Sequence, residues 1–263
     1  MSDTGDTPIR VLSLAQLARR GAWEVSLPHD RPEHLIIWIT RGQGRMLLGG
    51  AQSGFGPHTL LNIPANSLFA LDFGAQALGH VLMLPALSYE TWRPGPPDVP
   101  QAHRISASSD QVALTALFET LLREQREKSA DWPAALQALA QMVVIQQKRL
   151  SPEPQRPSAA TRLITAYCDQ ISRTYASGAL MADHAAGLGV TPTHLTRVCK
   201  ANTGRSAADL LNQRIAHAVR IALADSGKSA AEIAKDLGFA NASGFNRFVR
   251  RHFGVTPGAL RRG

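Results

Sequence analysis

The sequence lacks the features that mark secreted and membrane-spanning proteins. It holds two cysteines in 263 residues, and Cys168 and Cys199 lie far from any Cys-x-x-Cys spacing, so we expect buried free thiols in a reducing compartment. No apolar run approaches the ~18 residues of a membrane-spanning helix. The polar start, residues 1–8, has neither the basic nor the apolar region of a signal peptide. We therefore expect a cytoplasmic protein with no membrane partner.

Signals of enzymatic chemistry are missing too. His29, His34, His58 and His80 are scattered, with no His-x-His pair and no Glu shortly after His58, whereas a metal site needs a cluster of two or three ligands. Neither a nucleophile elbow nor a phosphate-binding loop is present, and residues 42–44 form only a turn signal. We expect no enzyme, no metal and no cofactor.

Positive charge is concentrated toward the C-terminal end. Residues 159–263 contain 14 Lys and Arg against 6 Asp and Glu, whereas residues 1–158 contain 14 against 14. The net charge of +8 therefore lies in the C-terminal part. Localised positive charge is typical of a protein that binds a phosphate backbone, although a solvated basic face or an acidic lipid surface would also produce it.

The same region contains one pattern twice. Residues 182–210 and 231–260 align with an offset of 49, which becomes 50 after one inserted residue. A repeat that carries the basic charge favours a duplicated DNA-binding helix-turn-helix over a repeat kept for packing alone. The matched pairs are Ala185 with Ala234, Leu188 with Leu237, Gly189 with Gly238, Leu195 with Phe245, Arg197 with Arg247, Val198 with Phe248, Lys200 with Arg250, Gly204 with Gly254, Ser206 with Thr256 and Leu210 with Leu260.

Each copy has the parts of a helix-turn-helix, in which a first helix supports a second helix that enters the major groove. Gly189 and Gly238 suit the left-handed end of each first helix. Thr191 and Asn241 suit the N-cap of each second helix. Helical spacing predicts that the residues facing inward are Leu195, Val198 and Cys199 in the first copy and Phe245, Phe248 and Val249 in the second.

The residues left on the outer faces of the second helices are candidates for contact with double-stranded DNA. Arg suits guanine, Asn suits adenine and Thr packs on the thymine methyl group, while basic residues further along each helix suit phosphates. An outward Arg is often only solvated, but the matched positions of Arg197 and Arg247 favour the DNA contact. The candidates are Thr193, His194, Thr196, Arg197 and Lys200 in the first copy and Ser243, Asn246, Arg247, Arg250 and Arg251 in the second.

The second copy carries a more specific signature. Gly238-Phe239 and the run from Phe245 to Pro257 resemble the C-terminal signature of AraC/XylS-family transcription regulators, and the resemblance covers about residues 159–262. It implies two reading helices that enter successive faces of the major groove, about one helical turn (~34 Å) apart. By match to that signature, the base-facing positions are Thr193, Thr196 and Arg197, with Ser243, Asn246 and Arg247 as their counterparts.

The sequence departs from the family pattern at a few packing positions. Cys199 stands where the family usually has Phe, and Leu260 stands where Tyr is common, with Gly258 and Ala259 at positions that are usually polar. These departures bear on the stability of the packing more than on DNA binding.

The N-terminal part is predicted to be a small β-domain. Short apolar runs separated by Gly, Pro and Asn predict an antiparallel barrel or sandwich, and their order resembles the family's cupin-like sensor barrel. The expected strands are residues 34–39, 45–48, 59–63, 68–73 and 80–84, followed by a stiff proline-rich connector at 93–100.

Two amphipathic helices are expected after the connector. The first has Leu114, Leu117, Phe118, Leu121 and Leu122 at helical spacing and begins at a cap provided by Ser108 or Ser109. The second has Trp132, Leu136, Leu139, Val143 and Leu150 on one face, with Pro133 in its first turn. The pair could complete the core of the β-domain, pair with its copy in a second subunit, or do both.

The predicted fold class is α+β with two domains. Residues 1–105 are expected to form the effector-binding barrel, 106–150 the dimerising helix pair, 151–158 a proline-rich linker and 159–263 an all-α domain with the two helix-turn-helix units. A barrel of this size can hold one small molecule in its mouth, although aromatic residues on strands are usually core. The candidate effector-binding residues are Trp38, Arg41, Arg45, Phe69, Phe73 and His80, with Trp92 as a further aromatic.

Three functional hypotheses remain at this point. The first is a homodimeric DNA-binding transcription regulator, an activator that contacts RNA polymerase and responds to a small-molecule effector in the barrel. The alternative is a constitutive or architectural DNA-binding protein whose barrel serves only in assembly. The third is a cupin enzyme joined to a DNA-binding domain, which the lack of clustered metal ligands disfavours.

Overall fold

The computed structural model describes residues 9–93, 99–152 and 156–262. It divides into two compact units, of which the first runs to Arg156 and the second begins at Pro157, with Leu27–His29 grouped with the second. Most of the expected connector at 93–100 and part of the expected linker at 151–158 lie outside the described residues.

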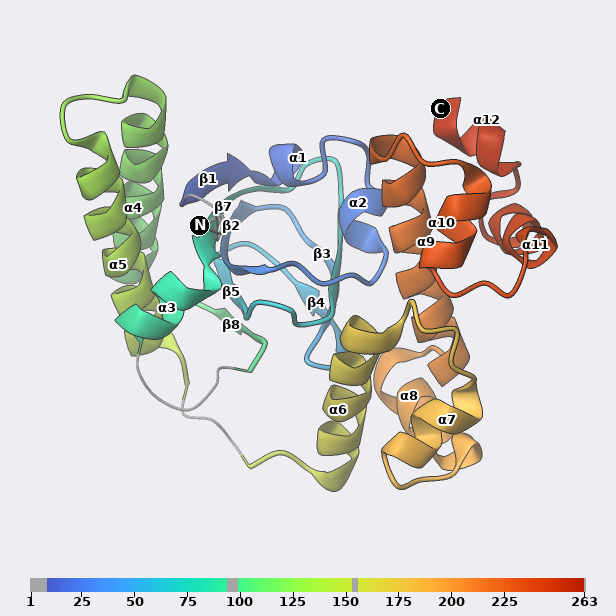
Figure 1. Ribbon diagram of the computed structural model, residues 1–263. Coiled ribbons are helices and arrows are strands. Elements are labelled where there is room, and N and C mark those ends of the chain that lie inside the picture. The colour runs from blue at the N-terminus through green and yellow to red at the C-terminus, as the bar shows by residue number, and fades with distance from the viewer. Residues whose placement is uncertain (1–8, 94–98, 153–155, 263) are drawn as a thin grey trace. The chain divides into compact units, whose positions relative to one another are not determined.

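The N-terminal unit is built on two antiparallel sheets (Figure 1). A five-stranded sheet has the order β1-β7-β2-β5-β8, and a three-stranded sheet has the order β4-β3-β6. The expected antiparallel β-domain is confirmed, but the described strands form two sheets and not one closed barrel. The strands are β1 Arg10–Ser13, β2 Glu33–Arg41, β3 Gly44–Leu48, β4 Ala51–Phe55, β5 Thr59–Ile63, β6 Phe69–Phe73, β7 Leu78–Pro85 and β8 Gln101–Arg104.

Three of these strands have no counterpart among the expected ones: β1, β4 and β8. All three are edge strands, and β1 and β8 contain only four residues each. In β4 every residue except Phe55 is exposed. Edge strands with polar, exposed residues carry little hydrophobic periodicity, so their pairing depends on neighbours that are distant in sequence.

The five-stranded sheet is buried on both faces. Strand β2 alternates between two cores: Ile36 and Trp38 belong to one, while Leu35, Ile37 and Ile39 belong to the other. The second core also contains Met46, Phe55 and Phe69 of the three-stranded sheet, so it lies between the sheets. Two-sided burial explains why β2 reads as a continuous apolar run.

The helix pair α4 (Ser108–Glu127) and α5 (Trp132–Leu150) covers the opposite face of the five-stranded sheet. Leu114, Phe118 and Leu121 of α4 are fully buried in the same core as Trp38, which confirms that the pair completes the core. Pro133 lies in the first turn of α5 as expected. The expected serine cap of α4 is wrong, because Ala107 is the N-cap residue and both serines lie inside the helix.

Three short helices complete the described part of this unit: α1 Leu14–Leu17, α2 Trp23–Ser26 and α3 Ala86–Trp92. The capping box of Ser13 and Gln16 begins α1. Tyr89 of α3 is buried, and its hydroxyl donates to Oε1 of the buried Gln147 of α5 over 3.2 Å. This contact joins α3 to the helix pair.

The C-terminal unit is helical throughout its described elements (Figure 1). Helix α9 follows the first helix-turn-helix and precedes the second, so it packs with both α8 and α10. The last helix, α12, packs on α9 and α11. The helices are α6 Ala159–Thr174, α7 Met181–Gly187, α8 Pro192–Thr203, α9 Ala207–Asp225, α10 Ala230–Asp236, α11 Ala242–Phe253 and α12 Pro257–Arg262.

The two cysteines are buried and free, as expected. Burial raises the pKa of Cys168 to about 12 and that of Cys199 to about 11, so both thiols stay protonated and weakly reactive at neutral pH. Within the ranges that the structure describes, no helix is both long and apolar enough to cross a membrane. Among the same residues, no group of three or more His, Cys, Asp or Glu is placed to hold a metal ion.

Candidate DNA-binding surface

The turns of the two helix-turn-helix units are closed in the same way. In the first, Gly189 has φ +67° and the N–H of Val190 donates to the carbonyl of Ala185 over 3.1 Å. In the second, Gly238 has φ +73° and the N–H of Phe239 donates to the carbonyl of Ala234 over 2.9 Å. These are left-handed helix ends of the Schellman type. The aligned alanines and glycines of the repeat therefore build equivalent turns.

Both second helices begin with a side-chain cap, as the sequence predicts. Oγ1 of Thr191 accepts from the N–H of His194 over 3.2 Å at the start of α8. Oδ1 of Asn241 accepts from the N–H of Gly244 over 2.8 Å at the start of α11. Each cap leaves the first turn of the helix exposed and carrying the positive end of the helix dipole. Anionic phosphates are favoured at such a position.

The inner faces of α8 and α11 hold them against their supporting helices. Leu195, Val198 and Cys199 are buried as expected, with Cys199 fully covered. In the second unit Phe245 and Val249 are buried, while Phe248 is half-buried. The ring of Phe239, which follows the turn, packs edge-on against both Phe245 and Phe248.

The ten candidate DNA-binding residues all remain at least partly accessible. Only His194 and Thr196 are half-buried, and the other eight are exposed. The exposed ones are Thr193, Arg197 and Lys200 on α8 and Ser243, Asn246, Arg247, Arg250 and Arg251 on α11.

One contact distinguishes the two outer faces. The guanidinium of Arg197 lies with Nη2 2.9 Å from Nδ1 of His194. Since arginine can only donate, this imidazole nitrogen accepts and the ring proton is on Nε2. The position that aligns with His194 in the second unit is Gly244, which has no side chain.

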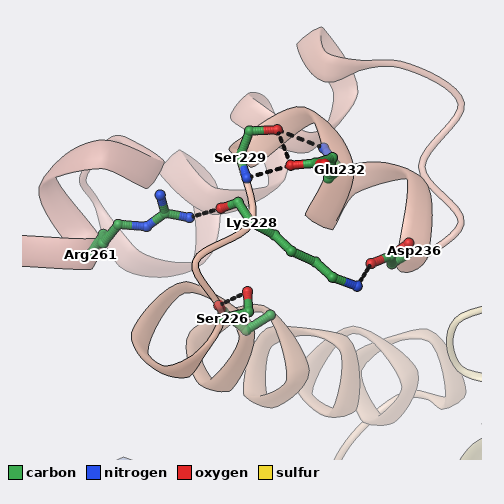
Figure 2. Close-up of polar contacts among 7 residues, drawn as sticks. Ser226, Lys228, Ser229, Glu232, Asp236 and Arg261 are labelled. Atoms are coloured by element: carbon green, nitrogen blue, oxygen red, sulfur yellow. Dashed lines mark hydrogen bonds and ion pairs between the residues drawn. The ribbon is translucent and has the colours of Figure 1, made fainter.

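The start of the second helix-turn-helix is stabilised by a set of polar contacts (Figure 2). Ser229 and Glu232 form a capping box, with the Glu232 carboxylate 2.7 Å from the N–H of Ser229. These hydrogen bonds lower the pKa of Glu232. Lys228 pairs with Asp236 over 2.6 Å, and Arg261 of α12 donates to the carbonyl of Lys228. These contacts fix both ends of the supporting helix α10 and connect the residues just before it to α12.

The residues expected to bind an effector do not meet in one cavity. Trp38 is fully buried, and its indole N–H donates to Thr115 of α4 over 3.0 Å. Phe69 is 1% exposed in the other core, between the sheets. His80 stacks on Phe118 of α4, and burial lowers its pKa.

The remaining effector candidates lie at the periphery of the sheets. Phe73 packs at the edge of the inter-sheet core, Trp92 packs against the helix-pair core, and Arg41 is exposed at the end of β2. Arg45 is the one effector candidate that lines a pocket formed by β3, β4, β5, β6 and β8. Met46, Phe55 and Arg104 also line this pocket and were not among the expected residues. Phe55 and Arg104 lie on β4 and β8, two strands that the sequence did not predict.

A family model described as a helix-turn-helix domain matches residues 184–263. This range holds all ten candidates on α8 and α11 and both turns. The C-terminal part of the chain is an AraC-type helix-turn-helix domain. The resemblance on Gly238-Phe239 and the run from Phe245 to Pro257 is thereby confirmed, and a chain with such a domain is a DNA-binding transcription regulator.

Two solved structures illustrate what this chain is similar to. ToxT K231A from Vibrio cholerae is 14% identical, with 97% of this chain and 96% of that chain covered and a TM-score of 0.44. The C-terminal domain of AraT, a response regulator from Geobacillus stearothermophilus, is 25% identical, with coverages of 41% and 88% and a TM-score of 0.37. Among curated proteins, no sequence matches this chain.

Proposed function

We propose that this chain is an effector-controlled transcription activator that reads two successive faces of the major groove with α8 and α11. The observation that supports the two-headed reading is the pair of capped helices with equivalent turns and exposed polar faces. An exposed, capped N-terminal half is what a recognition helix needs to approach base edges.

The two helices have matching positions for base contacts. Arg197 and Arg247 are exposed at the same place in the repeat, where each guanidinium can pair with O6 and N7 of a guanine. Asn246 suits adenine, and Thr193, Thr196 and Ser243 complete the base-facing set. Lys200, Arg250 and Arg251 lie further along the helices, where they suit phosphates. His194 contributes by holding the side chain of Arg197 through their hydrogen bond.

Substitutions of matched arginines test this assignment. An operator is first selected from random duplexes with the full-length protein, and Arg197→Ala and Arg247→Ala are then measured separately. Each is expected to weaken binding by about 1–3 kcal/mol and to relax specificity at different base positions. Arg250→Ala serves as the phosphate control, with a sequence-independent loss and a salt slope reduced by about 1. A uniform, salt-dependent loss for Arg197→Ala and Arg247→Ala would overturn their role in reading bases.

The N-terminal unit supplies dimerisation and effector control in this proposal. Residues 1–105 would bind the effector, and residues 106–150 would pair with their copy in a second subunit. Met142 and Ile145 of α5 are 42% and 40% exposed, one helical turn apart, on the side that the core leaves uncovered. An exposed apolar pair on a helix that already packs by its other face supports a contact with a second copy.

Effector control is tested through the operator. The affinity and footprint of the full-length protein are compared before and after addition of a small molecule that binds the N-terminal unit, and transcription with RNA polymerase is measured alongside. A ligand that shifts operator affinity and raises transcription supports the proposal. Identical affinity and footprint in both states would instead favour a constitutive, architectural DNA-binding protein.

A further inference from the structure

A pocket of about 780 Å³ lies in the N-terminal unit and is lined by both sheets. The three-stranded sheet contributes β3, β4 and β6, and the five-stranded sheet contributes β5 and β8. Strands β4 and β8 are edge strands of their sheets. The pocket therefore lies beside edge strands of both sheets. A closed barrel would have no such edges. Its size falls within the ~300–1,000 Å³ of small-molecule sites.

Arginine dominates the charge of this pocket. Arg45 and Arg104 both line it and are exposed, and no hydrogen bond or ion pair is found for either within the described ranges. The lining contains one carboxylate, Asp72, which lies opposite Arg45 in the β3–β6 ladder. The residue opposite Arg104 in the β5–β8 ladder is Thr59, which is neutral. Arg104 is therefore the less compensated of the two cations.

The strand register places Arg104 on the side that faces the space between the sheets. Ala102, two residues before it in β8, packs against the inter-sheet core, and alternate residues of a strand share a face. Thr59 lies on the same face as Leu61, another member of that core. The hydroxyl of Thr59 already donates to the carbonyl of Gly56 over 2.8 Å, so the guanidinium is the strongest polar group available there.

Part of the pocket wall is apolar. Met46 and Phe55, each 7% exposed, line the pocket and belong to the inter-sheet core. His103 adds no charge, because burial lowers its pKa. The pocket thus combines a cationic group with an apolar part of its wall, which suits a molecule with an anionic head and an apolar body.

We propose that this pocket binds a small organic carboxylate, with the carboxylate on Arg104 and the apolar body against Met46 and Phe55. Arg104 is the anchor. Arg45 directly precedes Met46 in β3, so it lies on the opposite face of that strand, where Asp72 offsets its charge. The inference rests on the proposed effector control of the N-terminal unit and names the chemical class and the place of the effector.

The test is calorimetric titration of the full-length protein with hexanoate, benzoate and decanoate, each beside the amide of the same body. We expect at least one carboxylate to bind saturably at one site per chain, and its amide to bind at least tenfold more weakly. Arg104→Gln is expected to weaken the binding of that carboxylate at least tenfold, and Arg45→Gln is expected to weaken it by a smaller factor. Arg19→Gln removes the same charge from an exposed position of the N-terminal unit outside the pocket and should leave the affinity unchanged.

Each contrary result overturns the site. No saturable binding of any of the three carboxylates, equal affinity for acid and amide, or unchanged affinity in Arg104→Gln would each do so. A second readout separates this site from the proposed function, namely operator affinity with the bound carboxylate present. If the carboxylate binds through Arg104 but operator affinity does not change, the site stands and effector control fails. If the carboxylate changes the operator affinity of Arg104→Gln as much as that of the wild-type protein, effector control stands and the site fails.

Discussion

His194 and Arg197, one turn apart on α8, are joined by a hydrogen bond from the guanidinium to Nδ1 of the imidazole over 2.9 Å. The aligned arginine of the second unit, Arg247, has Gly244 in the position of the histidine. Helix α8 therefore presents an arginine whose side chain is already held by a neighbour, whereas α11 presents one without this support. Ordering a long side chain on binding costs about 0.5–1.5 kcal/mol, so the difference should be measurable.

His194→Ala is expected to weaken operator binding by a few-fold, because Arg197 must then be ordered on binding. Gly244→His should strengthen contacts of the second half-site, and the space beside Gly244 permits it, since an added Cβ lies 3.5 Å from Asn241 Oδ1. Gly244→Ala controls for helix propensity alone. A double-mutant cycle of His194→Ala with Arg197→Ala, measured by operator titration, should be non-additive. Strict additivity would show that the two side chains act separately.

Gly189 and Gly238 should differ sharply on substitution, although both have left-handed φ values. An added Cβ at Gly189 meets no atom within 4 Å, whereas at Gly238 it would lie 2.5 Å from the carbonyl oxygen of Ala176 and from the N of Gly178. Gly189→Ala should lower the free energy of unfolding by about 1 kcal/mol through backbone strain alone. Gly238→Ala should lower it by about 3 kcal/mol or more, because backbone must also move. Equal losses in urea unfolding would contradict the close approach.

His184 predicts a pH dependence of stability. It is 2% exposed on α7, its Nδ1 has no hydrogen-bond partner among the described residues, and burial lowers its pKa from 6.5. The unfolded chain therefore binds the proton more readily, so the contribution of this neutral histidine is complete above about pH 6.5 and declines as the pH falls below it. Its counterpart in the second unit is Ile233, which is buried.

His184→Ile should raise the free energy of unfolding by about 1 kcal/mol, since an unsatisfied polar atom is replaced by an apolar one. Thermal unfolding of both proteins at pH 5.5 and 7.5 checks the assignment. The gain should be larger at pH 5.5. A gain that is the same at both pH values would show that His184 does not titrate in this range.

Met142→Arg and Ile145→Asp test the proposed dimer contact on α5. Each places a charge on an exposed apolar position, so the fold should be kept while self-association weakens at least tenfold in sedimentation equilibrium. Leu87→Arg on α3 is the matched control, because Leu87 is 72% exposed but lies on another helix. Unchanged self-association in both α5 variants, or an equal loss in Leu87→Arg, would exclude this face.

The helix-turn-helix units could be predicted in detail because their determinants are local. Glycine at a left-handed helix end and a capping Thr191 or Asn241 act within a few residues, and apolar spacing on one helix states which face is buried. The inward positions of Leu195 and Phe245 and the exposed positions of Arg197 and Arg247 follow from that spacing. The aligned repeat then made the family resemblance specific.

The sheet domain shows the limit of such reasoning. Trp38 and Phe69 both read as aromatic residues on strands, yet the structure places them in different cores, Trp38 under α4 and Phe69 between the sheets. The pocket is completed by Phe55 and Arg104, from two edge strands without hydrophobic periodicity. Local chemistry within the sequence determined the helices α8 and α11 and their exposed faces. Only the tertiary structure decided which residues share a cavity, because strand pairing joins residues that are distant in sequence and a single step in register moves a side chain to the opposite face.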